Sequence, residues 1–169
     1  DEGISIEALA RAFTSFRGIQ RRQEVLGEVN GVTVVDDFAH HPTAVRATIR
    51  ACKSRWENRR IVAVFEPRSN SSRRKVFESG YADAFSEADA AFLSRPPFRH
   101  NDNEADFMNI DVILEKLQSN EIDAFVAPNV DELLGRLTTY LKTGDVVLIM
   151  SNGGFGNIHR RLLTNLETV

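Results

Sequence analysis

The sequence predicts a doubly wound α/β fold whose mostly parallel sheet carries an antiparallel hairpin at its N-terminal edge. From Val32 onward, short apolar runs alternate with helix-like segments, which is the order of repeated right-handed β–α–β crossovers. These runs are apolar throughout, as in parallel strands that helices cover on both faces. A third observation is Asn30-Gly31, a dipeptide that favours a two-residue hairpin turn because both positions need positive φ. The predicted sheet is therefore Rossmann-like.

The first part of the chain is predicted to contain a helix and a linker. Apolar residues recur at helical spacing from Ile4 to Phe16, and the segment RGIQRR then breaks this pattern with a glycine and a basic cluster. We assign residues 1–21 to this helix and linker. The next segment, QEVLGEVNGVTVVDD, contains two strand-like runs around Asn30-Gly31 and is predicted to form the hairpin.

The remaining elements follow in pairs, each strand before a helix. In order, they are VTVVD before PTAVRATIRACKSR, RIVAVFE before RRKVFESGYADAFSE, ADAAFLS before IDVILEKLQS, DAFVA before VDELLGRLTTYLK, and DVVLIM before IHRRLLTNL. The segment SRPPFRHNDNEAD, Ser94 to Asp106, is the one long polar loop. Residues 22–169 are therefore predicted to form a single α/β domain.

The composition is that of a soluble globular protein. The chain has 169 residues, of which 42% are hydrophobic and 27% charged, with a net charge of -3. A chain of this length buries roughly 70% of its extended surface, so it can hold a substantial core. The 21 Lys and Arg residues are dispersed and the isoelectric point is about 5.8, so we expect no nucleic-acid partner.

The sequence also predicts a cytoplasmic protein without a membrane partner. No apolar run approaches about 18 residues, and no basic segment precedes an apolar one as in a signal peptide. The single cysteine, Cys52, lies in a predicted helix, fits a reducing compartment and is interpreted as a small core residue. Because the chain starts at Asp1, inside a helix-like phrase, we expect it to be a fragment of a longer protein.

Polar or glycine-rich loops follow three of the predicted strands. They are Asp36 to Thr43, Glu66 to Asn70, and Ser151 to His159. In an open parallel sheet, ligands bind beyond the carboxyl ends of the strands, where loops lead into helix N-termini. Three such loops on one edge, after strands that are themselves apolar, predict a binding site there.

The first of these loops, DDFAHHPT, has three interpretations. Pro42 suits the first position of a helix, so Asp36 or Asp37 could simply cap that helix. A zinc site would need three or four converging ligands, but His40 and His41 are adjacent and the other histidines are not at ligand spacing, so we expect no metal here. In a polar-ligand site, Asp37 would accept hydrogen bonds from hydroxyls such as those of a ribose, and His40 would lie near an anion.

The other two loops are suited to anions. The glycines of SNGGFGNIH allow close approach to the backbone, whose N–H groups can hold a carboxylate or phosphate, although a plain tight turn is the alternative. Arg68 in EPRSN could grip a carboxylate in a bidentate manner, or could be an ordinary surface arginine. The sequence contains no G-x-G-x-x-G, G-x-S-x-G or P-loop pattern, which disfavours a dinucleotide site and a hydrolase.

The segment RRQEVLGEVNGVTVVDDFAHHPTAV resembles a junction in the ATP-dependent Mur ligases. At this junction, an R-x-E phrase, a hairpin and a D-[DY]-[FY]-[AG]-H-x-P phrase connect the central ATPase domain to the C-terminal domain. By this resemblance, residues 1–21 are the last helix and linker of the central domain, and residues 22–169 are the C-terminal domain. One departure from the pattern is Asn157, where the resemblance leads us to expect a glycine.

The resemblance implies roles for specific residues. Arg22 would reach the ATP phosphates, Asp37 would contact the ribose, and His40 would lie close to the nucleotide. A second group would face the incoming peptide: Arg68, Ser69, Asn70, Ser151, Asn152, Gly153, Gly154 and Phe155. The resemblance assigns no catalytic residue and no metal ligand to this chain.

The phrases EPRSN and SNGGFG are most similar to the branch of the family that acts in peptidoglycan recycling. That branch joins UDP-N-acetylmuramate to the tripeptide L-alanyl-γ-D-glutamyl-meso-diaminopimelate. The resemblance implies that ATP phosphorylates the muramate carboxylate and that the peptide amine then attacks the acyl phosphate. It also implies roles in peptidoglycan and cell-wall biosynthesis, cell shape and cell division.

The resemblance further implies ATP and Mg²⁺, bound mainly by the central domain, and the N-terminal and central domains of the same chain as partners. Because no P-loop is present, we expect this chain to be inactive alone. Two alternatives stay open: the C-terminal domain of the L-alanine-adding ligase, and a nucleotide- or peptide-binding module without catalytic activity.

Overall fold

A computed structural model describes residues 3–16, 18–100 and 102–168. The strands are β1 (Glu24–Val29), β2 (Val32–Asp37), β3 (Ile61–Phe65), β4 (Ala90–Ser94), β5 (Asp123–Ala127) and β6 (Val146–Met150). The α-helices are α1 (Ile6–Ser15), α2 (Pro42–Arg55), α3 (Glu78–Phe85), α4 (Ile110–Ser119), α5 (Val130–Tyr140) and α6 (Ile158–Glu167). Short 3₁₀ helices are η1 (Lys75–Phe77), η2 (Glu104–Asp106) and η3 (Phe155–Asn157).

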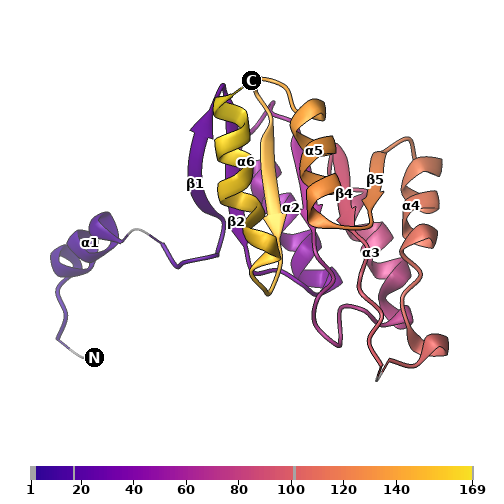
Figure 1. The fold of residues 1–169 in the computed structure, drawn as a ribbon. Coiled ribbons are helices and arrows are strands. Elements are labelled where there is room, and N and C mark those ends of the chain that lie inside the picture. Colours follow the sequence, from indigo (N-terminus) through magenta and orange to yellow (C-terminus); the bar gives the residue numbers. More distant parts are fainter. Residues whose placement is uncertain (1–2, 17, 101, 169) are drawn as a thin grey trace.

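The strands form one six-stranded sheet in the order β1-β2-β6-β3-β4-β5 (Figure 1). Only β1 runs antiparallel to its neighbour, and the remaining pairs are parallel. The predicted fold class is therefore confirmed. Asn30 and Gly31 connect β1 to β2 with φ values of 51° and 77°, as a type I′ hairpin turn requires.

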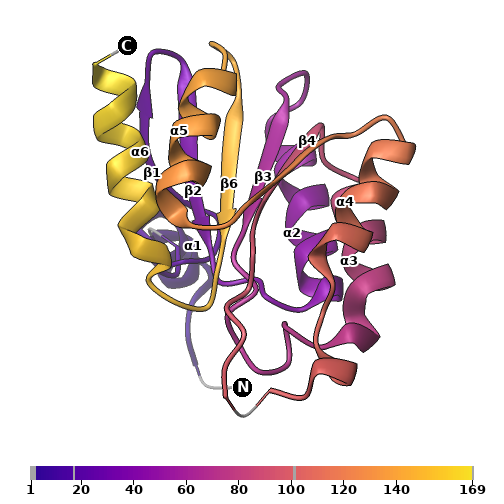
Figure 2. The ribbon, with the colours of Figure 1, turned by 45° about the vertical axis from the view of Figure 1, so that its right-hand side comes forward.

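Helices cover both faces of the sheet (Figure 2). One apolar layer joins α2, α3 and α4 to strand residues such as Val35 and Ala63, and the other joins α5 and α6 to residues such as Val34 and Val64. Neighbouring residues of a strand thus belong to opposite layers, because side chains alternate along it. Cys52 lies in the first layer, where burial, followed by the charge of Asp37, raises the pKa of its thiol to about 12. Its interpretation as a core residue is confirmed.

One predicted helix is shorter than expected, and another is present but packs on nothing in the described residues. The segment RRKVFESGYADAFSE forms η1 and α3, while Arg73 and Arg74 stay outside the helix because the neighbouring loop captures their backbone. Met108 N donates to Arg73 O at 2.7 Å, and Arg74 forms an isolated bridge with Phe107. The first helix, α1, is present as predicted but buries none of its residues and projects away from the sheet (Figure 1).

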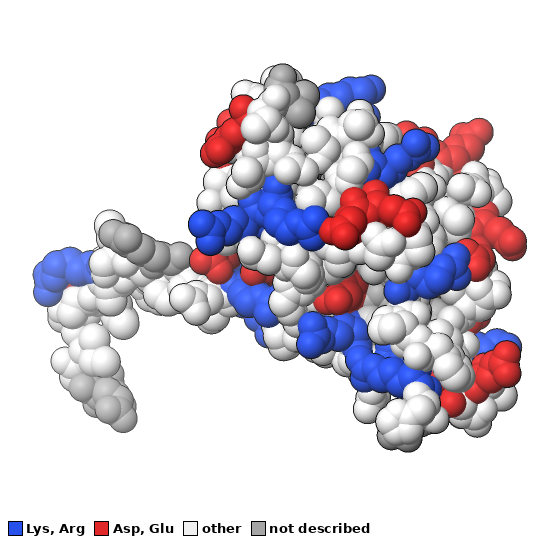
Figure 3. All heavy atoms as spheres, viewed as in Figure 1, with Lys and Arg blue, Asp and Glu red and all other residues white. Residues whose placement is uncertain are grey.

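Charged residues of both signs lie side by side on the face shown in Figure 3. An example is the ion pair between Arg161 on α6 and Asp131 on α5, at 2.6 Å. Within the described residues, we find no helix with the length and apolar character needed to cross a membrane.

Candidate functional site

Three adjacent strands end level with one another at one edge of the sheet, which we call the carboxyl rim. Asp37 of β2 and Phe65 of β3 both pair with Met150 of β6. The loops then stay in register, because Ser151 N donates to Asp37 O at 3.2 Å and Glu66 N donates to Met150 O at 3.1 Å. The three loops selected from the sequence therefore lie together, as predicted.

The Asp37 carboxylate is buried and shapes the first loop. Only 3% of the residue is exposed, and its oxygens accept hydrogen bonds from Ala39 N at 2.7 Å and Gln23 N at 2.9 Å. The helix cap is a different residue from those expected, since His41 is extended and precedes Pro42, and its Nδ1 accepts from Thr43 N at 3.4 Å. The interpretation in which Asp36 or Asp37 caps α2 is therefore wrong: Asp37 instead ties the turn to Gln23, just before β1.

Arg22 and His40 flank the ring of Phe38. The Arg22 guanidinium lies 5.6 Å from the ring centroid, and the His40 ring meets the same ring edge-on at 5.4 Å. His40 Nδ1 lies 2.9 Å from Phe38 O, and the hydroxyl of Tyr81 donates to His40 O at 2.6 Å. Arg22 is exposed and His40 is half-buried, so both side chains border the surface at this point.

The sequence analysis did not identify a network of polar side chains beside this loop. Asp36 Oδ2 lies 3.1 Å from Arg21 Nε, and Asp36 Oδ1 lies 3.1 Å from His159 Nε2. Burial acts to raise the pKa of Asp36, but His159 and Arg21 outweigh it, so the pKa lies below its ordinary value. The two neighbouring aspartates point to opposite faces of the sheet, as residues of a strand must.

Arg21 also holds the glycine-rich loop. Its Nη2 donates to Ser151 O at 2.6 Å and to Gly153 O at 3.0 Å. Within that loop, Ser151 is fully buried, its Oγ donates to Glu66 Oε2 at 2.5 Å, and it accepts from Gly153 N at 2.9 Å. The loop is thus fastened both to the linker and to the loop after β3.

The side chains of the other predicted residues in this loop differ in placement. Asn152 Oδ1 is buried and has no hydrogen-bond partner among the described residues. Phe155 is fully buried in the core layer under α5 and α6, so a ligand could reach only its backbone. Its φ of 42°, and φ values of 55° and 57° at Gly156 and Asn157, turn the chain sharply into α6. Asparagine tolerates this left-handed conformation, which explains how it replaces the expected glycine at 157.

Arg68 connects the glycine-rich loop to the loop after β3. A Cβ built on Gly153 would overlap the Arg68 side chain, so Arg68 lies directly against this glycine. Arg68 itself is exposed. The next residues stabilise their own loop: Ser69 Oγ accepts from Ser72 N at 3.0 Å, and Asn70 Oδ1 accepts from Arg73 Nη2 at 3.0 Å.

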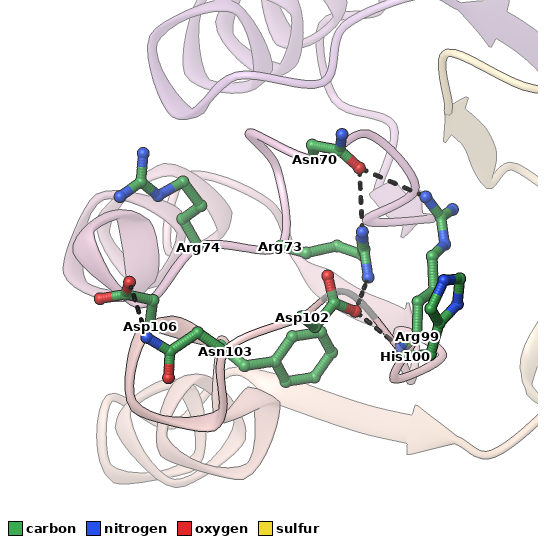
Figure 4. A pocket seen from close by; sticks show the side chains of 9 residues that line it. Asn70, Arg73, Arg74, Arg99, His100, Asp102, Asn103 and Asp106 are labelled. Atoms are coloured by element: carbon green, nitrogen blue, oxygen red, sulfur yellow. Dashed lines mark hydrogen bonds and ion pairs between the residues drawn. The ribbon is translucent and has the colours of Figure 1, made fainter.

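A cavity of about 490 Å³ opens beside Asn70, between the loops that follow β3 and β4 (Figure 4). Its lining residues are mostly charged or polar: Asn70, Arg73, Arg74, Arg99, His100, Asp102, Asn103, Asp106 and Phe107. The sequence signal for it was the long polar loop from Ser94 to Asp106, to which no role was assigned.

The cavity is built around Arg73, which is only 3% exposed. Its Nη1 donates to Asp102 Oδ2 and, at 3.1 Å, to Pro97 O, while its Nε has no partner among the described residues. Burial acts to raise the pKa of Asp102, but hydrogen bonds from Arg73 and from the backbone of Arg99 hold it below its ordinary value. With Asp102 paired to Arg73, the cavity surface retains the positive groups Arg74 and Arg99 beside Asp106.

The described residues contain no group of three or more His, Cys, Asp or Glu side chains that could hold a metal ion. The carboxyl rim does present exposed guanidinium groups and the backbone of a glycine-rich loop, which are groups that can bind anions.

Comparisons with known proteins agree with this fold. The model of the family described as "Mur ligase, glutamate ligase domain" matches residues 21–153. Two curated relatives, from Escherichia coli and Haemophilus influenzae, are UDP-N-acetylmuramate–L-alanyl-γ-D-glutamyl-meso-2,6-diaminoheptandioate ligases. They are 38% and 37% identical over 97% and 98% of this chain, and each alignment covers 34% of the relative. A crystal structure of a murein peptide ligase from Psychrobacter arcticus is similar with a TM-score of 0.76 and 36% identity, covering 99% of this chain and 34% of that one. The chain thus spans about a third of the length of these relatives.

Proposed function

The chain belongs to the Mur ligase family, and on this premise we propose that it acts as the C-terminal domain of an ATP-dependent ligase that forms amide bonds. The substrates we propose are UDP-N-acetylmuramate and the tripeptide L-alanyl-γ-D-glutamyl-meso-diaminopimelate, and the process is peptidoglycan recycling. The similarity of nearly the whole chain to two ligases with this name supports the choice of substrates.

One structural observation carries the proposal. Arg68 lies against Gly153, and this contact joins the two loops expected to face the peptide. Arg99, which lines the cavity, donates from Nη2 to Arg68 O at 3.1 Å and so connects these loops to the cavity. The tripeptide carries several carboxylates and an ammonium group at its diaminopimelate end. A surface with arginines beside Asp106 matches both charges, whereas L-alanine alone would leave most of the cavity unused.

We propose that Arg22, Asp37 and His40 form the nucleotide-facing part of the site. Arg22 and His40 border the surface around Phe38, where an anionic phosphate could meet them. Asp37 would act mainly through the turn that its carboxylate holds together, with its remaining lone pairs directed at a ribose hydroxyl. In this proposal, Mg²⁺ and the phosphate cradle would come from the central domain, since this sequence contains no P-loop pattern.

In this proposal, the domain contributes by positioning. The central domain would transfer the γ-phosphoryl group of ATP to the muramate carboxylate. The alanine amine would then attack the acyl carbon, with phosphate as the leaving group and the amine proton lost to solvent or a base. Arg68 and the loop Ser151 to Gly154 would hold the peptide so that amine and acyl carbon meet in near-attack geometry.

The test uses purified full-length protein with UDP-N-acetylmuramate and ATP, and offers tripeptide, L-alanine or neither. We expect ADP release and amide product with the tripeptide only. Product with L-alanine alone would instead identify the L-alanine-adding ligase, and binding without any product would identify a non-catalytic module. The 169-residue chain by itself is expected to give no product.

Cavity variants test the peptide's location. Arg99→Gln should raise the KM for tripeptide about tenfold or more, because a hydrogen bond to a charged group contributes about 1.5–3 kcal/mol. Arg161→Gln is the matched control, since its ion pair with Asp131 lies on the outer surface of α6 and α5. Equal effects of both substitutions on KM would contradict the proposed location.

A further inference from the structure

Arg21 connects three segments that are far apart in the sequence. Its backbone N donates to Glu24 Oε2 at 2.8 Å, and its backbone O accepts from Phe38 N at 2.9 Å. Its side chain binds Asp36 at the end of β2 and the carbonyls of Ser151 and Gly153 after β6. The end of the predicted linker is therefore bonded directly to two of the three rim loops.

The backbone and the side chain of Arg21 both indicate that this position requires an arginine. Its φ of 56° is left-handed, which costs a residue with a side chain roughly 1–2 kcal/mol and persists only where the surroundings enforce it. The planar guanidinium binds Asp36 through Nε and the two carbonyls through Nη2, a fork that a lysine ammonium cannot reproduce.

Arg21 also determines which way the loop amides point. In a trans peptide, the C=O and the following N–H point in opposite directions. Because the carbonyls of Ser151 and Gly153 face Arg21, the N–H groups of Asn152 and Gly154 face away from it. Neither N–H has a hydrogen-bond partner among the described residues, so both can bind an anionic ligand.

Asp36 holds this arrangement from both ends of the loop. One oxygen lies 3.1 Å from Arg21, which grips the beginning of the loop, and the other lies 3.1 Å from His159, in the first turn of α6 where the loop ends. The two atoms of the second contact are buried and have no hydrogen-bond partner among the described residues, so each is the nearest polar group recorded for the other.

We propose that Arg21 is a positioning residue that sets the conformation of the Ser151 to Gly154 loop and thereby the binding of the carboxylate-bearing amine substrate. The identity of that substrate rests on the proposed function above. Arg21 then moves together with the α/β domain. We therefore expect any bend between this domain and α1 to occur before Arg21, at Gly18 to Gln20.

The molecule contains a matched control for this role. Arg59 makes a similar clamp at the opposite end of the sheet, where its side chain donates to Gly144 O at 2.7 Å and to Gly31 O and Asp145 O at 3.0 Å. Both arginines therefore fasten loops through backbone carbonyls, but only Arg21 fastens a loop of the carboxyl rim.

The first experiment measures amide hydrogen exchange in the 169-residue chain for Arg21→Lys, Arg21→Gly and Arg59→Lys. Glycine accepts positive φ, so Arg21→Gly keeps the backbone path even if the lysine variant folds poorly. We expect faster exchange at residues 151–157 in both Arg21 variants, and at residues 30–31 and 143–145 in Arg59→Lys. Unchanged exchange at 151–157 in Arg21→Gly would overturn the proposal, whatever reaction the protein catalyses.

The second experiment measures steady-state kinetics of the full-length ligase with the same substitutions. Arg21→Lys should raise the KM for tripeptide about tenfold, within the roughly hundredfold that a misplacement of about 1 Å can cost. The KM for ATP should stay within about twofold, and Arg59→Lys should lower the melting temperature without changing either KM. If Arg21→Lys changes both KM values equally, or neither, Arg21 has a general structural role. A wild-type enzyme without ligase activity would refute the proposed function and leave the exchange result to decide the loop assignment.

Discussion

At both ends of the sheet, arginine side chains bind backbone carbonyls of the loops, but the two ends differ in how exposed their arginines are. At the amino end, Arg59 and Arg60 bind the carbonyls and the carboxylate around Asp145, which is only 2% exposed and also accepts from Lys142 N at 2.9 Å. At the carboxyl rim, Arg21 makes a comparable clamp, but Arg68 is exposed and further arginines line a cavity. We call the amino end closed, because its arginines are bound to backbone carbonyls and a carboxylate. We call the carboxyl rim open, because Arg68 and Arg99 stay exposed there.

The distribution of unsatisfied groups supports this contrast. Among the described residues, the buried polar side-chain atoms without a hydrogen-bond partner are on Asp36, Arg73, Asn152 and His159. Three of them lie in the loops or at a strand end of the carboxyl rim, and His159 lies beside them in the first turn of α6, while none lies at the amino end. Asp36 and His159 face each other at 3.1 Å, but Arg73 Nε and Asn152 Oδ1 are buried without any such partner, and buried polar groups are normally satisfied. We therefore infer that these two atoms mark a site.

The largest effect is expected from Phe155→Ala, which tests whether this rim residue serves packing. Its side chain is fully buried, so the substitution should cost about 3–5 kcal/mol in the free energy of unfolding. Urea unfolding measures this loss, with Phe98→Ala as control because Phe98 is 57% exposed. A small loss in stability together with a large rise in the KM for peptide would mean that Phe155 belongs to the open part of the rim.

The closed end should depend strongly on Asp145. Asp145→Ala removes the partner of Arg60 and Lys142 N and should cost about 2–3 kcal/mol, below the 3–5 kcal/mol of a fully buried pair because the Arg60 side chain is 36% exposed. Asp111→Ala is the control, since its pair with Arg95 is 46% exposed on both sides and should contribute no more than about 1 kcal/mol. Similar losses in both variants, measured by urea unfolding, would remove the basis for calling the amino end closed.

Two glycines sharpen the comparison further. Gly31→Ala at the amino end meets the Thr143 side chain and a φ of 77°, so it should cost about 1–2 kcal/mol. Gly153→Ala at the carboxyl rim meets only the exposed Arg68 side chain, which can move, so stability should change by less than about 0.5 kcal/mol. Thermal unfolding of both variants checks the order, and a reversed order would show that the rim loop is the more rigid one.

The smallest effect is expected in how the contribution of Asp36 to the free energy of unfolding changes with pH. Its pKa in the folded protein lies below the ordinary value of 3.8, so its contribution to stability is complete above that value and is lost as the pH falls through the lower, folded pKa. The difference in unfolding free energy between wild type and Asp36→Asn should therefore shrink under acid conditions. A difference that is constant with pH, measured by urea titrations, would show that the Arg21–Asp36–His159 network is not electrostatic.

Much of the fold could be predicted because its signals are local. Asn30-Gly31 needs only its own backbone preferences to specify the hairpin, and the apolar runs specify strands covered on both faces. The edge that carries the site followed from the same pattern, because parallel strands all place their carboxyl ends at one edge. The residues within that edge were less predictable: His41 rather than an aspartate caps α2, and Phe155 faces the core.

The sequence by itself determined the order of strands and helices, the hairpin turn, the edge where we propose that ligands bind and the resemblance to the Mur ligases. Only the tertiary structure decided that β6 lies between β2 and β3, so that the loop from Ser151 reaches Arg21 and Arg68. It also decided that Asp36 faces His159 while Asp37 holds the backbone of Gln23. The physical reason is that these contacts depend on strand order and side-chain direction, which no local pattern encodes, and several join residues far apart in the sequence, such as Arg21 and Ser151.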